Sequence, residues 1–257
     1  MGSTPVLIHG FTGSGGAWGP EIVDGLAGAG FAPAAIDLPG HGRNRGQVDP
    51  VAYSIEAVLA EIGGASEAPS SLLGYSMGGR LALHCAVRFP DRVARLVLES
   101  ASPGLPGEQE RRIRQREDFE LADRILRVGI EAFVEEWAAQ PLFASQARLP
   151  RHTRERVAAG RLANDPASLA ASLRALGTGS LSPLWDELSD FQVPTLIVVG
   201  ALDSKFVQIG ERMADAMPNA RLVVVPDAGH CVHLERPRLW VEAVTEFLKA
   251  PQASVHP

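Results

Sequence analysis

The chain has 257 residues, 46% of them hydrophobic, which is enough to bury a full core as one large domain or as a domain with an insertion. Its formal net charge of −6 argues against nonspecific nucleic-acid binding, and no run reaches the roughly 18 apolar residues of a membrane helix. Two cysteines provide neither a disulfide framework nor a metal cluster. We therefore expect a cytoplasmic protein, and we expect no bound metal.

Short apolar runs alternate along the chain with longer stretches of helical period, such as residues 80–89 and 209–217. This alternation predicts an α/β fold with a mostly parallel sheet and helices on both faces. Only four residues precede the first run, so we expect a shortened N-terminal edge of the sheet. The runs that are typical of buried strands are residues 5–10, 32–37, 70–75, 93–100, 194–200 and 220–225.

Residues 103–183 interrupt this alternation, because they contain mostly helix formers and no convincing strand. PGLPG opens the segment and LSPLW closes it. We expect a helical cap over the carboxyl ends of the strands, where open α/β sheets place their ligands. The predicted organisation is therefore a core of residues 1–102 and 184–257 with a cap of residues 103–183.

The sequence GYSMGGR, residues 74–80, follows the apolar run SSLL and precedes a helical stretch. Gly-x-Ser-x-Gly between a strand and a helix is typical of a sharp turn that exposes a serine hydroxyl above the sheet. Small residues let such a turn close and let the helix pack tightly. The pattern therefore makes Ser76 the candidate catalytic residue.

A serine hydroxyl needs a base, and the base needs an orienting acid. His230, in DAGHCVHLERP, is the favoured base, and His233 three residues later is its rival. Asp203, in the loop after residues 194–200, is the favoured acid, since Ser, Asp, His is the order that such folds use. Glu99, at the end of another strand, is the alternative acid.

Two backbone amides are expected to hold a developing oxyanion. The N–H of Met77 directly follows the serine, and the N–H of Phe11 lies in the glycine-rich stretch HGFTGSGG. A phosphate-binding interpretation of these glycines fails, because no Gly-Lys-Ser/Thr follows them. No nucleotide motif or ligand cluster appears, so no cofactor is expected.

These motifs together resemble a known superfamily. HGFTGSG, IDLPGHG, GYSMGGR, GALDSKF and AGH follow one another as in the α/β-hydrolases, over essentially the whole chain. Within that superfamily, ESASPGL with ERRIRQRED, EEWAAQPLFASQ, and DSKF before AGH resemble the menaquinone-pathway lyases that act as 2-succinyl-6-hydroxy-2,4-cyclohexadiene-1-carboxylate synthases. These cap motifs discriminate much better than the serine motif, which many esterases share.

The resemblance implies elimination of pyruvate from 2-succinyl-5-enolpyruvyl-6-hydroxy-3-cyclohexene-1-carboxylate, with Ser76 as a general base on carbon. The partner would be a small polycarboxylate. Arginine binds carboxylate through two parallel hydrogen bonds. The positions that match the family's substrate contacts are Arg80, Arg114, Arg161, Trp137 and Tyr75.

Two other functions remain open from the sequence. A carboxylesterase or carbon–carbon bond hydrolase of the same fold would use Ser76 as a nucleophile or to activate water, and the fold does not decide between these reactions. A non-catalytic binding protein is the third interpretation, which the intact Ser76, Asp203 and His230 disfavour. The oligomeric state is not readable from the sequence.

Overall fold

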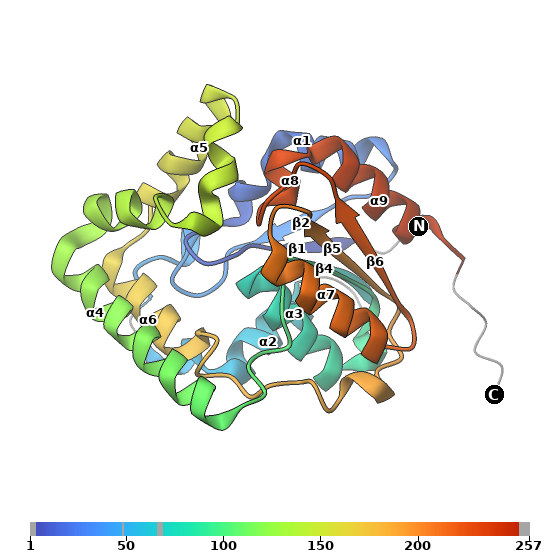
Figure 1. Ribbon diagram of the computed structural model, residues 1–257, viewed down its shortest axis with the longest axis horizontal. Helices are drawn as coiled ribbons and strands as arrows, with labels where there is room; N and C mark the ends of the chain where they lie inside the picture. The colour runs from blue at the N-terminus through green and yellow to red at the C-terminus, as the bar shows by residue number, and fades with distance from the viewer. Residues whose placement is uncertain (1–3, 48, 66–68, 252–257) are drawn as a thin grey trace.

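The computed structural model describes residues 4–47, 49–65 and 69–251. Its centre is one six-stranded sheet with the order β2-β1-β3-β4-β5-β6, and every described strand pair is parallel (Figure 1). The α/β class predicted from the sequence is therefore confirmed. The strands are β1 (Pro5–Ile8), β2 (Ala34–Ile36), β3 (Ser70–Tyr75), β4 (Val93–Glu99), β5 (Thr195–Gly200) and β6 (Ala220–Val225).

Both faces of the sheet are buried, because alternate residues of each strand enter different hydrophobic clusters. Val6 and Ile8 of β1 join the cluster beneath α2, α3 and α7, whereas Leu7 joins the cluster beneath α1 and α9. Side chains of a strand point alternately to its two faces, so a doubly covered strand is apolar throughout. The covering helices are α1 (Gly19–Gly28), α2 (Ile55–Gly64), α3 (Met77–Arg88), α7 (Ser204–Ala216) and α9 (Pro237–Lys249), with the short α8 (Val232–Glu235) before α9.

The strand order reverses around β1, which lies between β2 and β3. The chain leaves β1 toward β2 on one side, and it later returns to form β3 on the other side. The loops that follow β1 and β3 therefore adjoin each other at the carboxyl edge of the sheet. This is the position where open parallel sheets form a ligand crevice.

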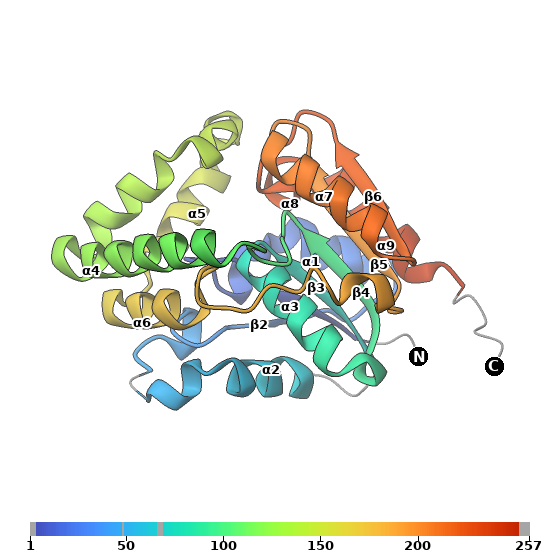
Figure 2. The same ribbon diagram turned by 60° about the horizontal axis from the view of Figure 1, so that its bottom comes forward.

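Residues 103–183 contain helices and no strand, as expected. They form α4 (Glu108–Ala138), the 3-10 segment η5 (Pro141–Arg148), α5 (Arg151–Leu162) and α6 (Pro166–Leu176). In both views α4, α5 and α6 gather on one side of the molecule, and β6 and α9 lie on the opposite side (Figures 1 and 2). The helices α4 and α6 share a small core around Ile125, Phe133 and Leu169. Gly129, at φ 78°, bends α4 between its two halves.

Two buried histidines support the loops after β1 and β2. His9 Nε2 accepts the Leu38 N–H at 3.0 Å, and His41 Nδ1 lies 3.0 Å from the Pro39 carbonyl oxygen. Burial lowers the pKa of His9 to about 4. Burial, and then the nearby charge of His9, lowers the pKa of His41 to about 3. Both imidazoles are therefore neutral in the folded protein near neutral pH.

Within the described part of the chain, no helix is long and apolar enough to cross a membrane. The same residues contain no group of three or more His, Cys, Asp or Glu side chains that could hold a metal ion.

Replacing Gly74 with alanine is expected to lower the free energy of unfolding by about 2 kcal/mol, since overpacking a close contact costs about 1–3 kcal/mol. An added Cβ would lie 2.5 Å from the Gly78 carbonyl oxygen and from Gly79 Cα, and both are backbone atoms. Urea unfolding measures the change. Gly63→Ala is the control, because the nearest atom to its added Cβ, in the Arg92 guanidinium, is 4.0 Å away. Equal effects of the two changes would contradict the packing at the turn.

Lowering the pH from 6.5 toward 4 is expected to reduce the free energy of unfolding. In the unfolded chain His9 and His41 bind protons below the ordinary histidine pKa of 6.5, but in the folded state they stay neutral until their lowered pKa values are reached. The unfolded state therefore binds more protons, and each histidine contributes a loss of up to about 1.4 kcal/mol per pH unit. Urea unfolding of His41→Gln at several pH values should show a shallower slope than wild type. The exposed His152→Gln should keep the wild-type slope.

Candidate active site

Ser76 forms the junction between β3 and α3 with a left-handed backbone, at φ 53° and ψ −111°. Its N–H donates to the carbonyl oxygen of Glu99 at the end of β4, at 2.8 Å. A non-glycine residue rarely adopts this conformation, and it persists only where the surroundings hold it. The structure therefore contains the sharp strand-to-helix turn that the glycine pattern predicts.

Ser76, His230 and Asp203 come from three loops, and their side chains form one continuous chain of hydrogen bonds. His230 Nε2 lies 3.1 Å from Ser76 Oγ, and His230 Nδ1 lies 2.7 Å from Asp203 Oδ2. Asp203 precedes α7, and its Oδ1 also accepts the Phe206 N–H at 3.4 Å. When Nδ1 carries the proton that it donates to Asp203, Nε2 can accept the hydroxyl proton of Ser76. This arrangement can activate the hydroxyl as a base or as a nucleophile.

The rival residues Glu99 and His233 pair with each other instead. Glu99 Oε1 lies 2.8 Å from His233 Nδ1 and accepts the His233 N–H at 3.1 Å. Both side chains are buried. The His233 ring packs against Trp18 and Tyr75, with ring centroids 4.6 and 5.0 Å apart. The structure therefore pairs His230 with Asp203 and His233 with Glu99, and only His230 reaches the Ser76 hydroxyl among the described hydrogen bonds. The roles of Asp203 and His230 as acid and base remain predictions.

Glu235 fixes the loop that carries His230, although no sequence motif pointed to it. Its Oε2 accepts the Gly229 N–H at 2.8 Å, and its Oε1 accepts the Cys231 N–H at 3.4 Å. The carboxylate thus binds the amides on both sides of His230. The feature of the sequence that could have pointed to Glu235 is its place five residues after His230, at the start of the ERP tripeptide.

The two proposed oxyanion donors belong to loops that meet at Ser76. Met77 is the first residue of α3. Phe11 lies in the loop after β1, where a Cβ placed on Gly10 would be 3.4 Å from Ser76 Cβ and 2.8 Å from the Tyr75 ring. This close approach requires a residue without a side chain at Gly10. The loop backbone therefore lies directly beside the serine, and the donor roles of Phe11 and Met77 remain predictions.

A cavity of about 220 Å³ lies beside this turn, between the loop after β1 and the helix α5. Arg161 and Arg156 line it, and no Asp or Glu belongs to its described wall. Arg161 is buried, with its guanidinium carbon 4.8 Å from the centroid of the Phe143 ring and its Nη2 3.4 Å from Gln146 Oε1. A wall with two cations and no carboxylate favours an anionic ligand. The sequence predicted Arg161 as a site residue but did not predict Arg156 or Phe143. Arg156 gave no signal, because an arginine on a helix is ordinarily an exposed, solvated charge.

The other two predicted arginines lie outside the wall of this cavity. Arg80 is buried and donates to Thr178 Oγ1 at 2.9 Å and to the Leu176 carbonyl oxygen at 2.8 Å, so it joins α3 to the end of α6. Arg114 forms an ion pair with the buried Asp118 at 2.7 Å. Burial, and then the charge of Arg114, lowers the pKa of Arg80 to about 10. The structure therefore separates Arg161 from Arg80 and Arg114.

Tyr75 and Trp137 take different positions. Tyr75 lines the cavity, its hydroxyl lies 2.9 Å from Cys231 Sγ, and burial keeps its pKa well above the usual value. Trp137 packs among aromatic rings, 5.5 Å from Phe11 and 5.7 Å from Phe143 between centroids. Its buried Nε1 has no hydrogen-bond partner among the described residues. Tyr75 thus lines the cavity, whereas Trp137 packs against the Phe11 ring, and a contact of either with a substrate remains a prediction.

Known proteins resemble this chain over nearly its whole length. The family of the α/β-hydrolase fold matches residues 6–237. The 2-succinyl-6-hydroxy-2,4-cyclohexadiene-1-carboxylate synthase of Salmonella typhimurium is 32% identical over 245 residues, which is 95% of this chain and 93% of that protein. A Bacillus subtilis relative, provisionally named as the same synthase, is 42% identical over 247 residues, 95% of this chain and 89% of the relative.

The solved structures agree with these relatives. The structure of MenH from S. aureus has a TM-score of 0.88 and 32% identity, and the match covers 96% of this chain and 93% of that chain. An esterase from Exiguobacterium antarcticum, at 20% identity and a TM-score of 0.77, shares the fold alone. The chain therefore belongs to the α/β-hydrolase fold family and, within it, to the 2-succinyl-6-hydroxy-2,4-cyclohexadiene-1-carboxylate synthases.

Proposed function

We propose that the protein eliminates pyruvate from 2-succinyl-5-enolpyruvyl-6-hydroxy-3-cyclohexene-1-carboxylate and forms 2-succinyl-6-hydroxy-2,4-cyclohexadiene-1-carboxylate. The observation that carries this proposal is the hydrogen-bonded Ser76, His230 and Asp203, whose chain neighbours Tyr75 and Cys231 line a cavity with two guanidinium groups and no carboxylate among its described residues. The substrate bears three carboxylates. An esterase for apolar substrates has no use for paired cations in this cavity.

In this function Ser76 acts as the base and is not acylated. His230 takes the hydroxyl proton through Nε2, and Asp203 stabilises the imidazolium through Nδ1. Ser76 Oγ removes a proton from the carbon next to the succinyl carbonyl. The charge that develops on the carbonyl oxygen is held by the N–H groups of Phe11 and Met77.

The bond changes balance without any added reagent. The electron pair of the broken C–H bond forms an enolate. As the enolate collapses, its electron pair forms the ring double bond between C2 and C3, the pair of the existing C3–C4 double bond moves to C4–C5, and the bond from C5 to the enolpyruvyl oxygen breaks with that oxygen keeping the pair. The departing group is the enolate of pyruvate, and protonation on its carbon gives pyruvate. Elimination thus uses a positioned base and an oxyanion site, which this fold also supplies to hydrolases.

The carboxylates require cations, which come from α3 of the core and from the helical segment, in this proposal a cap on the core. Arg161 serves one carboxylate inside the cavity. Arg80 and Arg114 serve another at the contact of α3, α4 and α6, where the Arg80 Nε is buried and has no partner among the described residues. Binding there replaces part of the present bonding of Arg80 to α6 and of Arg114 to Asp118. A cytoplasmic location also belongs to the proposal.

Supplying the enolpyruvyl substrate is expected to give pyruvate release by the wild-type protein, measured with a coupled lactate dehydrogenase assay. Ser76→Ala should lower kcat/KM about 10³-fold or more, which corresponds to about 4 kcal/mol of transition-state stabilisation. The reason is that no hydroxyl remains to accept the carbon-bound proton. A thermal unfolding scan of the variant should remain near wild type.

Pyruvate at the uncatalysed rate with wild-type protein would refute the lyase function. Efficient hydrolysis of an ester or of a carbon–carbon bond in its place, abolished by Ser76→Ala, would establish the alternative hydrolase. Slow cleavage of a short p-nitrophenyl ester alone does not distinguish the two, because an activated serine attacks such esters in either enzyme.

Arg161→Ala is expected to lower kcat/KM about 10²-fold, equivalent to about 3 kcal/mol, because a buried carboxylate loses its charge-assisted hydrogen bonds. Arg161→Lys should recover part of this loss, since lysine keeps the charge but not the two parallel donors. Arg154→Ala, at an exposed position of the same helix, should behave as wild type. An effect of Arg161→Ala below threefold would remove Arg161 from the substrate site.

A further inference from the structure

Arg156 lies on the face of α5 that lines the cavity next to Tyr75, the residue that precedes Ser76. Residues 156, 157, 160 and 161 all belong to the cavity wall. At 100° of rotation per residue they cover one continuous face of the helix, with Val157 and Gly160 in the middle and the two arginines at its edges. Arg156 and Arg161 are about 7.5 Å apart along the helix axis. The cavity is therefore flanked by two separate guanidinium groups of one helix.

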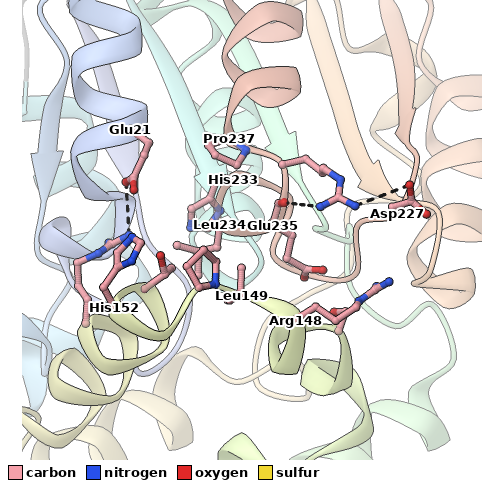
Figure 3. A pocket seen from close by; sticks show the side chains of 14 residues that line it. Glu21, Arg148, Leu149, His152, Asp227, His233, Leu234, Glu235 and Pro237 are labelled. Carbon is pink, nitrogen blue, oxygen red and sulfur yellow. Dashed lines mark hydrogen bonds and ion pairs between the residues drawn. The ribbon is translucent and has the colours of Figure 1, made fainter.

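Arg156 also lines a second cavity, of about 300 Å³, that lies between the helical segment and the core (Figure 3). His233 and Leu234 belong to both walls, so the two spaces adjoin. Glu21 of α1 also lines the second cavity, and its side chain is seen in Figure 3. Arg156 Nη2 lies 3.5 Å from Glu21 Oε2, and its Nη1 donates to the Ala17 carbonyl oxygen at 3.4 Å.

The present contacts of Arg156 are long and partly solvated. The Arg156 and Glu21 side chains keep 30% and 43% of their surface exposed. An exposed ion pair contributes about 0–1 kcal/mol, whereas a guanidinium bound to carboxylate in a water-excluded site forms a stronger bidentate pair. A ligand carboxylate in the cavity can therefore replace Glu21 as the partner of Arg156.

We propose that Arg156 is a carboxylate-binding residue of this active site, which receives a second carboxylate of the substrate in the cavity that Arg161 shares. The proposal rests on the proposed function, because it concerns the same polycarboxylate. Glu21 holds the guanidinium at the cavity wall in the free protein and releases it to the ligand. Arg156 binds the substrate and takes no part in the proton transfer at Ser76.

The structure offers variants that separate ligand binding from support of the fold. Arg156→Gln removes the charge, and Arg156→Lys keeps it. Glu21→Gln breaks the same ion pair from its other side but leaves the guanidinium in place. Arg154→Gln is the matched control, because residue 154 is exposed on the same helix and lines neither cavity. Pyruvate release is measured over a range of substrate concentrations for each variant.

We expect Arg156→Gln to raise KM about tenfold or more and to change kcat less than threefold, since a binding contact is lost equally from ground and transition states. Arg156→Lys should give an intermediate KM, and Arg154→Gln the wild-type KM. Glu21→Gln should leave KM unchanged or lower it, because the competing carboxylate is gone.

Two results would overturn the inference while the lyase function stands. One is a wild-type KM in Arg156→Gln. The other is an equal rise of KM in Arg156→Gln and Glu21→Gln, which would mean that the ion pair only supports the fold. Absence of pyruvate release from the wild-type protein would instead refute the proposed function itself, so the two failures are distinguishable.

Discussion

The left-handed backbone of Ser76 is the constraint on which the site depends, because β3 ends and α3 begins within a single residue. The turn needs a residue without a side chain at Gly74, because an added Cβ there would press against the backbone of Gly78 and Gly79. The hydrogen bond from the Ser76 N–H to Glu99 holds the strained turn from the adjacent strand. The hydroxyl is thereby presented to His230 at 3.1 Å before any ligand arrives.

Buried carboxylates organise the loops that meet at this turn. Asp203 orients the His230 ring, Glu235 binds the two amides that flank His230, and Glu99 binds both the backbone and the ring of His233. A buried carboxylate is costly unless its oxygens accept several hydrogen bonds, and each of these three accepts at least two. The bonds span β4, α7, α8 and the loops between them. The carboxylates of Asp203 and Glu235 therefore fix the position of His230, the residue next to the Ser76 hydroxyl.

Much of this architecture was predictable from the sequence. Apolar runs bounded by Gly, Asp or Ser located all six strands, because a strand buried on both faces needs no alternation with polar residues. The Ser, Asp, His order identified the three residues that the structure joins by hydrogen bonds. The strand runs were too long at some ends: residues 9 and 10 belong to the loop after β1 and not to the strand.

What the sequence could not supply was the direction of the arginine side chains around the site. Arg80, Arg114 and Arg161 matched one functional pattern, yet the fold places Arg161 on the cavity and the other two at the end of α6. Arg156 looked like any exposed helix charge, since its position relative to the cavity depends on how α5 is rotated against the core. The partners of Glu99 and Glu235 could not be predicted, because the pairing of Glu99 with His233 depends on tertiary contacts and the place of Glu235 after His230 did not say which amides it binds.

Phe11 belongs at once to the clusters of the core and of the helices α4 and α6, and its ring stands 6.4 Å from Phe133 and 5.5 Å from Trp137 between centroids. Any movement of α4 away from the sheet exposes this aromatic surface to water, at about 25 cal/mol for each Å² uncovered. The packing of α4 and α6 therefore bears directly on the loop that carries Phe11 next to the serine turn, through the ring contacts with Phe133 and Trp137.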